Sequence, residues 1–138
     1  MQTTGNPKRK KHNRMDTPAE TYISFYLRPN RIHVFIDALR GIGCPNRICF
    51  MMSEQGDSLL IAPYEKKDFR SHQVPNSAYN GIGRMEVSSR KLCRLIARKF
   101  NWKEDCSYRV PGIIYNEKPV VIFDLTKAAR IGQEDIMI

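Results

Sequence analysis

The sequence predicts an α+β, mostly β fold in which two similar β-α-β-β halves share one core. A strand followed by a basic helix occurs twice, first within residues 29–45 and again within 81–102. A turn of the hairpin type follows each helix and lies between two apolar runs. Because a short helix on three strands buries too little apolar surface to be stable alone, we expect the two halves to close one shared barrel.

The first half is predicted to span residues 20–64. The segment "TYISFYLRP" combines β-branched and aromatic residues and ends at a proline, which is typical of a strand. In the next strand, "NRIHVFI", polar and apolar positions alternate, so that Arg31, His33 and Phe35 share one face. Asp37 is expected to cap the short helix "ALRG". The runs "RICFMMSE" and "SLLIAPYE" then flank the hairpin turn "QGD".

The second half is predicted to span residues 81–126, after a polar linker over 65–80 with room for one turn of helix. "GRMEVS" predicts a strand, and Ser88 or Ser89 is placed to cap the basic helix "RKLCRLIARKFN". Apolar residues at three-and-four spacing predict the buried face of this helix: Leu92, Leu95, Ile96 and Phe100. "SYRVPGIIY" and "PVVIFDL" flank the second turn, "NEK". The C-terminal tail, 127–138, is expected to hold a short helix and a loose end.

The charge of the chain favours a polyanionic partner. The formal net charge is +9, and five of the 23 Lys and Arg residues lie in the first fifteen positions, which contain no acid. Residues 1–19 lack apolar periodicity and contain glycine and proline, so we expect a disordered tail. Its basic run is typical of a nucleic-acid-binding arm, an import signal or a solvated tail: Lys8, Arg9, Lys10 and Lys11.

The sequence contains no motif for catalysis, for a cofactor or for a metal. It lacks a G-x-S-x-G elbow, a P-loop and an H-E-x-x-H pair, so we expect no enzyme activity. The four cysteines form no C-x-x-C pair; free thiols are expected, with a Cys44–Cys106 disulfide as the alternative. No apolar run reaches the roughly 18 residues of a membrane span, and no secretory signal is present. We therefore expect no membrane partner and a cytoplasmic location.

Both halves resemble the AbrB-like swapped-hairpin DNA-binding family. "NRIHVFIDALRGIG" is similar to the opening strand and helix of that family, and "GRMEVSSRKLCRLIARKFNW" to a second copy with a longer helix. Two copies in one chain resemble the MraZ-type arrangement, and the similarity covers residues 23–64 and 81–126. It implies a single swapped-hairpin, or double-split, barrel. The chain departs from the family at Phe35 and Ser88, where a proline is usual, and at Asn30, where a glycine is usual.

The resemblance also implies that arginines of the first strand and the helix of each half contact duplex DNA. The residues that match by position are Arg31 and Arg40 in the first half and Arg84 and Arg94 in the second. Arg28 lies near the same edge, directly before Pro29. Guanidinium groups bind phosphates bidentately and read guanine edges in the major groove, so the chemistry suits them. Alternatively, the strand arginines only form ion pairs with Asp37 and Glu86, and Arg40 stabilises the C-terminus of its helix.

We therefore expect a DNA-binding protein, a small transcription regulator of the bacterial or phage type that is associated with the nucleoid. A first alternative is a protein-interaction module, antitoxin-like or inhibitory, whose basic face meets an acidic protein. A second is RNA binding, with bases stacked on strand aromatics: Tyr22, Phe25, Tyr26 and Phe35. The sequence leaves open whether the chain forms a homo-oligomer.

Overall fold

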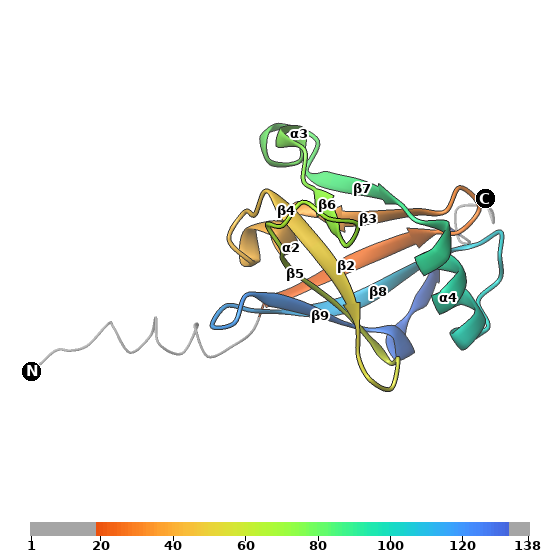
Figure 1. Cartoon of the computed structure of the whole chain (residues 1–138). Helices are drawn as coiled ribbons and strands as arrows, with labels where there is room; N and C mark the ends of the chain where they lie inside the picture. Colours follow the sequence, from red (N-terminus) through yellow and green to blue (C-terminus); the bar gives the residue numbers. More distant parts are fainter. Residues whose placement is uncertain (1–18, 133–138) are drawn as a thin grey trace, which may run out of the picture.

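Strands with alternating apolar residues form the framework of the molecule (Figure 1), which a computed structural model describes over residues 19–132. Eight strands follow one antiparallel path, in the order β6-β4-β5-β9-β8-β2-β3-β7, and make a nearly closed barrel. A ninth strand, β10, pairs with β8 alone. The predicted mostly β class with helices attached is therefore confirmed.

The first half of the chain contains two paired strands, a short helix and a hairpin. The elements are β2 (Ala19–Tyr26), β3 (Arg31–Phe35), α2 (Ile36–Gly41), β4 (Arg47–Met52) and β5 (Ser58–Pro63). The alternation predicted for β3 is confirmed, since Ile32 and Val34 are fully buried. The predicted cap of α2 is wrong: Phe35 holds the N-cap position, without a side-chain cap. One oxygen of Asp37, Oδ1, instead accepts hydrogen bonds from the Thr21 hydroxyl and the Ala38 backbone N–H, each at 2.8 Å.

The segment predicted as a polar linker contains two regular elements. Its expected turn of helix is α3 (Asn76–Asn80), and a short strand, β6 (Ser71–Gln73), precedes it. The strand was not predicted, because three polar residues carry no periodic signal of their own. β6 forms because the free edge of β4 offers it backbone partners over three residue pairs.

The second half contains a strand, a longer helix and a hairpin. The elements are β7 (Arg84–Ser88), α4 (Arg90–Phe100), β8 (Ser107–Tyr115) and β9 (Val120–Asp124). Of the two predicted caps, Ser89 holds the N-cap position, and its Oγ accepts from the Leu92 N–H at 3.2 Å. Leu95, predicted to be buried, is 56% exposed, because α4 turns Cys93, Ile96 and Ala97 toward the barrel instead.

The chain beyond β9 adds to the sheet. The predicted short helix is a single 3-10 turn, η1 (Leu125–Lys127), and β10 (Ala129–Ile131) follows it. The strand contradicts the expectation of a loose tail there, and it forms because the first residues of β8 have no other partner on that side. The rest of the predicted tail lies outside the described residues.

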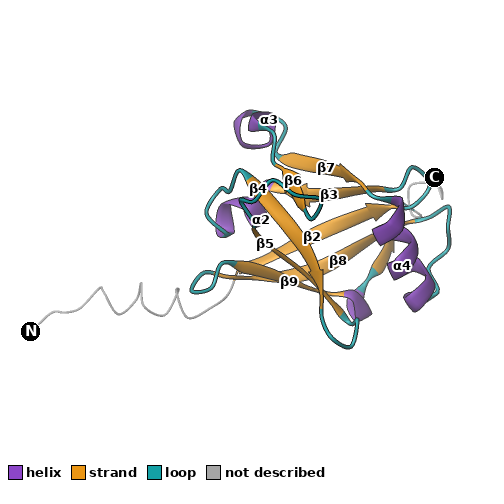
Figure 2. Ribbon diagram, in the orientation of Figure 1, coloured by secondary structure: helices purple, strands orange, loops and turns teal. Residues whose placement is uncertain are grey.

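The core draws on both halves, and the two longer helices lie at opposite ends of the barrel (Figure 2). Phe25, Leu59 and Phe123 are among the largest fully buried side chains. All four cysteines are free, so the alternative Cys44–Cys106 disulfide is absent. Among the helices of residues 19–132, none has the length and apolar character to cross a membrane.

Candidate nucleic-acid interface

The outer face of the β3–β7 pair carries the two predicted strand arginines. The strands are antiparallel, with Arg31 opposite Ser88 and Arg84 opposite Phe35. Because neighbouring residues of a strand point to opposite faces, both arginines project away from the core. His33 and Glu86, which are paired at the centre of the ladder, project from the same face.

One carboxylate connects the two arginines. Arg31 Nη1 lies 3.2 Å from Glu86 Oε1, and Arg84 Nη2 lies 3.2 Å from Glu86 Oε2. His33 Nε2 lies 3.7 Å from the same Oε2. The ion-pair alternative is thus realised through Glu86 for both strand arginines, whereas Asp37 forms no salt bridge with a described residue.

The protonation states of this cluster are coupled. Partial burial opposes the charged form of Glu86, but His33, Arg84 and Arg31 together hold its pKa below the ordinary value. Burial lowers the pKa of His33; Glu86 opposes this, and the positive charges of Arg84 and Arg31 add to it. Near neutral pH the cluster therefore consists of two guanidinium groups, one carboxylate and a largely neutral imidazole.

Two buried polar atoms, one on this face and one on the neighbouring strand β2, form no hydrogen bond with a described residue. Arg84 Nε is buried and has no hydrogen-bond partner among the described residues, and the same holds for Ser24 Oγ on β2. The His33 ring contacts the ring of Tyr26, with 4.6 Å between centroids. The face therefore combines cations, aromatic rings and an unsatisfied donor.

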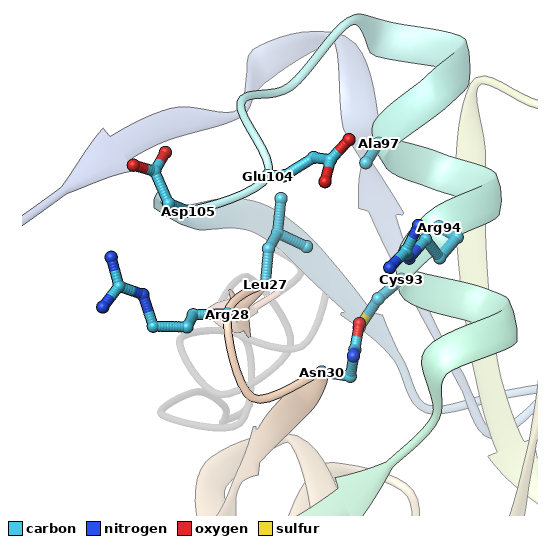
Figure 3. Close-up of a pocket in the computed structure, with 8 residues that line it drawn as sticks. All are labelled: Leu27, Arg28, Asn30, Cys93, Arg94, Ala97, Glu104 and Asp105. Atoms are coloured by element: carbon cyan, nitrogen blue, oxygen red, sulfur yellow. The ribbon is translucent and has the colours of Figure 1, made fainter.

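Arg28 and Arg94 line a pocket between the β2–β3 turn and α4. Its volume is about 250 Å³, and its wall includes Leu27, Asn30, Cys93, Ala97, Glu104 and Asp105. Figure 3 shows Arg94 on the helix side and Arg28 on the turn side, with the two carboxylates along a third side. No salt bridge shorter than 4.0 Å joins these groups among residues 19–132. Both arginines therefore keep donors that a ligand can use.

A backbone hydrogen bond connects this pocket with the strand arginines. The Ser89 N–H, at the start of α4, donates to the Asn30 carbonyl at 3.1 Å. Asn30 directly precedes Arg31 and also lines the pocket. The fold thus groups Arg28, Arg31 and Arg94 around the β2–β3 turn, and Glu86 connects Arg84 with them.

The other predicted contacts do not join this group. Arg40 lies in the last turn of α2, at the end of the barrel opposite α4 (Figure 1). The basic run Lys8, Arg9, Lys10 and Lys11 lies outside the described residues. Phe25, predicted as a stacking residue, is fully buried in the core, so that part of the RNA-binding alternative is wrong.

Sequence reasoning missed Arg109, on the outer face of β8. Its guanidinium carbon lies 5.7 Å from the ring centroid of Tyr22, within range of a cation–π contact. Arg109 and Tyr22 line a second pocket of about 230 Å³ with Thr21, Phe35 and Asp37. The alternation in "SYRVPGIIY" gave a signal, since Arg109 lies between the buried Tyr108 and Val110.

Comparisons of this chain with protein-family models, with curated proteins and with solved structures find no match.

Proposed function

We propose that this protein binds duplex DNA through the outer face of β3 and β7 and the adjoining start of α4. The observation that carries the proposal is the placement of Arg31 and Arg84 at equivalent positions of an antiparallel pair. Each arginine is the first residue of its strand and lies opposite the last residue of the other strand: Arg31 opposite Ser88, and Arg84 opposite Phe35.

Two backbone hydrogen bonds support an internal two-fold relation between the halves, which forms part of this proposal. The Ile36 N–H donates to the Gly83 carbonyl at 2.9 Å, and the Ser89 N–H donates to the Asn30 carbonyl at 3.1 Å. In each case the residue that follows one strand of the β3–β7 pair donates to the residue that precedes the other strand. On this basis we assign two repeated halves related by an axis near the His33–Glu86 pair.

The sheet order supports the proposal that the same relation extends to a swapped-hairpin barrel. The path β6-β4-β5 is followed by β9-β8-β2, so the hairpins β4–β5 and β8–β9 meet at a central β5–β9 pair. β2 of the first half pairs with β8 of the second, and β6 pairs with β4 of the first. β6 is thus the counterpart of β2 in the second half. On this basis we propose that the second half starts at Ser71 rather than at residue 81.

Duplex DNA is the partner that suits this face best. A DNA-binding protein with two-fold symmetry matches the local symmetry of the duplex, and its outward arginines meet equivalent phosphates. Residues 19–132 contain 18 Lys and Arg residues against 11 Asp and Glu, so the described part of the chain is basic without the tail. The resemblance to AbrB-like proteins points to the same partner and to a role in transcription.

The helix side of the face is expected to contribute more than the α2 side. α4 carries Arg90, Lys91, Arg94 and Arg98, whereas the first turn of α2 carries Asp37. Contacts with the phosphate backbone are therefore expected to be asymmetric about the axis, with Arg94 and Arg28 on the stronger side.

The test is a fluorescence-anisotropy titration of random duplex DNA, at about 50 and 200 mM salt. The variants are R84A/R94A, a chain without residues 1–15, and K118A/K127A as the charge-matched control. The control lysines flank β9, which is separated from β3 by β8 and β2 in the order of strands. We expect salt-sensitive binding that R84A/R94A reduces by tenfold or more, on the order of 1.4 kcal/mol, and that the control leaves nearly unchanged.

Other outcomes lead to different conclusions. Loss of binding only on removal of residues 1–15 would assign nucleic-acid binding to the tail and leave the barrel free for an acidic protein. Tighter binding to single-stranded RNA of equal length would favour the RNA alternative. No binding by any variant at low salt would contradict the proposal and favour the protein-interaction module.

A further inference from the structure

Arg31 and Arg84 donate to the same carboxylate, although they come from strands of different halves. Their nitrogens each lie 3.2 Å from a different oxygen of Glu86. A phosphate group also presents neighbouring oxygens to guanidinium donors. We infer that Arg31 and Arg84 form a phosphate subsite and that Glu86 occupies it in the free protein, where its carboxylate stands in for a phosphate.

A second observation points to an incoming acceptor. Arg84 Nε is buried without a partner, so Glu86 satisfies only part of the hydrogen-bonding capacity of this side chain. A carboxylate offers two oxygens, whereas a phosphate offers more acceptors and more negative charge. If the Arg84 side chain turns so that Nε reaches solvent, Nε and Nη2 can bind one phosphate as a fork, which is a frequent geometry of arginine–phosphate pairs.

The subsite is open to solvent. The side chains of Arg31, Arg84 and Glu86 are 53%, 37% and 38% exposed, respectively. A phosphate can therefore reach both guanidinium groups once Glu86 rotates aside. Glu86 then competes with phosphate for the two arginines and lowers the affinity of the face for any single backbone phosphate. Only a duplex that makes further contacts with the protein is then bound tightly.

A purely structural role of the ion pair leads to a different expectation. If Glu86 only stabilises the β3–β7 pair, its neutralisation weakens the fold and adds no binding of anions. Exposed ion pairs stabilise proteins only slightly, so the two roles differ mainly in the binding of phosphate. Anion binding is therefore the property to measure.

The first experiment does not depend on DNA. Thermal unfolding of wild type, Glu86→Gln and Glu117→Gln is followed as inorganic phosphate is added at constant ionic strength. Glu117 lies exposed in the β8–β9 turn, so E117Q makes the same change of charge away from the subsite. We expect phosphate to raise the Tm of E86Q clearly more than that of the other two proteins, because ligand binding stabilises the folded state.

The arginine origin of that shift is tested in a second variant. E86Q/R84Q keeps the amide at position 86 and removes one guanidinium group, so the additional phosphate-dependent rise in Tm should disappear. If E86Q responds to phosphate no more than E117Q does, the subsite is contradicted. If E86Q does not fold, E86A replaces it under the same comparison.

The second experiment measures duplex DNA, and here the inference rests on the proposed function. E86Q should bind random duplex DNA several-fold more tightly than wild type, with a salt slope steeper by about 0.9 for one additional phosphate contact. E117Q should behave like wild type. If wild type binds DNA and E86Q binds it no more tightly than E117Q does, the inference about Glu86 is overturned, whereas the proposal of DNA binding is retained. Absence of DNA binding together with a phosphate response of E86Q overturns the DNA proposal and retains the anion subsite.

Discussion

His33 and Glu86 face each other at the centre of the β3–β7 ladder, and their environments set how this face responds to pH. The pKa of each is lowered relative to its ordinary value. For both residues the folded state therefore favours the deprotonated form, so both contribute stability that is lost as pH falls. In the unfolded chain the imidazole is protonated at higher pH than the carboxyl group, because its ordinary pKa is 6.5 and that of the carboxyl group is 4.5.

The first prediction follows from His33. Between pH 6.5 and its lower folded-state pKa, the unfolded chain binds more protons than the folded chain, so the free energy of unfolding decreases as pH falls through this range. His33→Gln should make this decrease shallower. Urea titrations at about pH 7.5 and 5.5 measure it.

His72, whose pKa burial also lowers, provides the matched comparison on β6. H72Q should also reduce the pH dependence, and H33Q/H72Q should reduce it more than either single replacement. A slope in H33Q equal to that of wild type would show that His33 titrates in the folded protein as it does in the unfolded chain.

At the scale of elements, α4 depends on its N-terminal cap. Two adjacent serines precede the helix, and only Ser89 accepts a hydrogen bond from the first turn, from the Leu92 N–H. Ser88 is exposed and ends β7. Because Ser89 also donates its backbone N–H to Asn30, the start of α4 sets the position of the pocket that Arg94 lines.

Replacement of each serine tests this assignment. Ser89→Ala should lower the free energy of unfolding by about 1 kcal/mol, because an N–H of the first turn loses its acceptor. Ser88→Ala should change it by less than about 0.5 kcal/mol, as is usual for exposed positions. Chemical denaturation of the two variants gives the comparison, and equal losses would contradict the role of Ser89 as the cap.

For the whole molecule, the sharing of one core between the halves has a direct consequence for cooperativity. β2 pairs with β8 over eight residue pairs, and β5 pairs with β9, so neither half has a complete sheet by itself. The single tryptophan, Trp102, contacts the rings of both Phe25 and Tyr108 and thus reports on strands from both halves.

Leu39→Ala tests this coupling. Leu39 is fully buried in α2, at the opposite end of the barrel from α4, so its truncation should cost about 2–5 kcal/mol. The transition seen by Trp102 fluorescence and the one seen by far-ultraviolet circular dichroism should shift together. Leu95→Ala, at a 56% exposed position, is the control with little effect. Separate transitions in L39A would contradict a shared core.

The sequence by itself determined the features that depend on neighbouring residues. Alternation in "NRIHVFI" predicted which side chains of β3 face the core, and Ser88-Ser89 marked the start of α4. The hairpin turns predicted the pairs β4–β5 and β8–β9. These signals are local, because side-chain periodicity, capping and turn chemistry act over a few residues.

Only the tertiary structure decided which distant groups meet. The pairing of β3 with β7 brings Glu86 to Arg31 from 55 positions away, and no local pattern carries that distance. The strands β6 and β10 exist because sheet edges offer them backbone partners, not because of their own composition. The exposure of Leu95 likewise depends on which face of α4 meets the barrel. Such choices depend on the summed packing and hydrogen bonding of the whole chain, which local propensity does not contain.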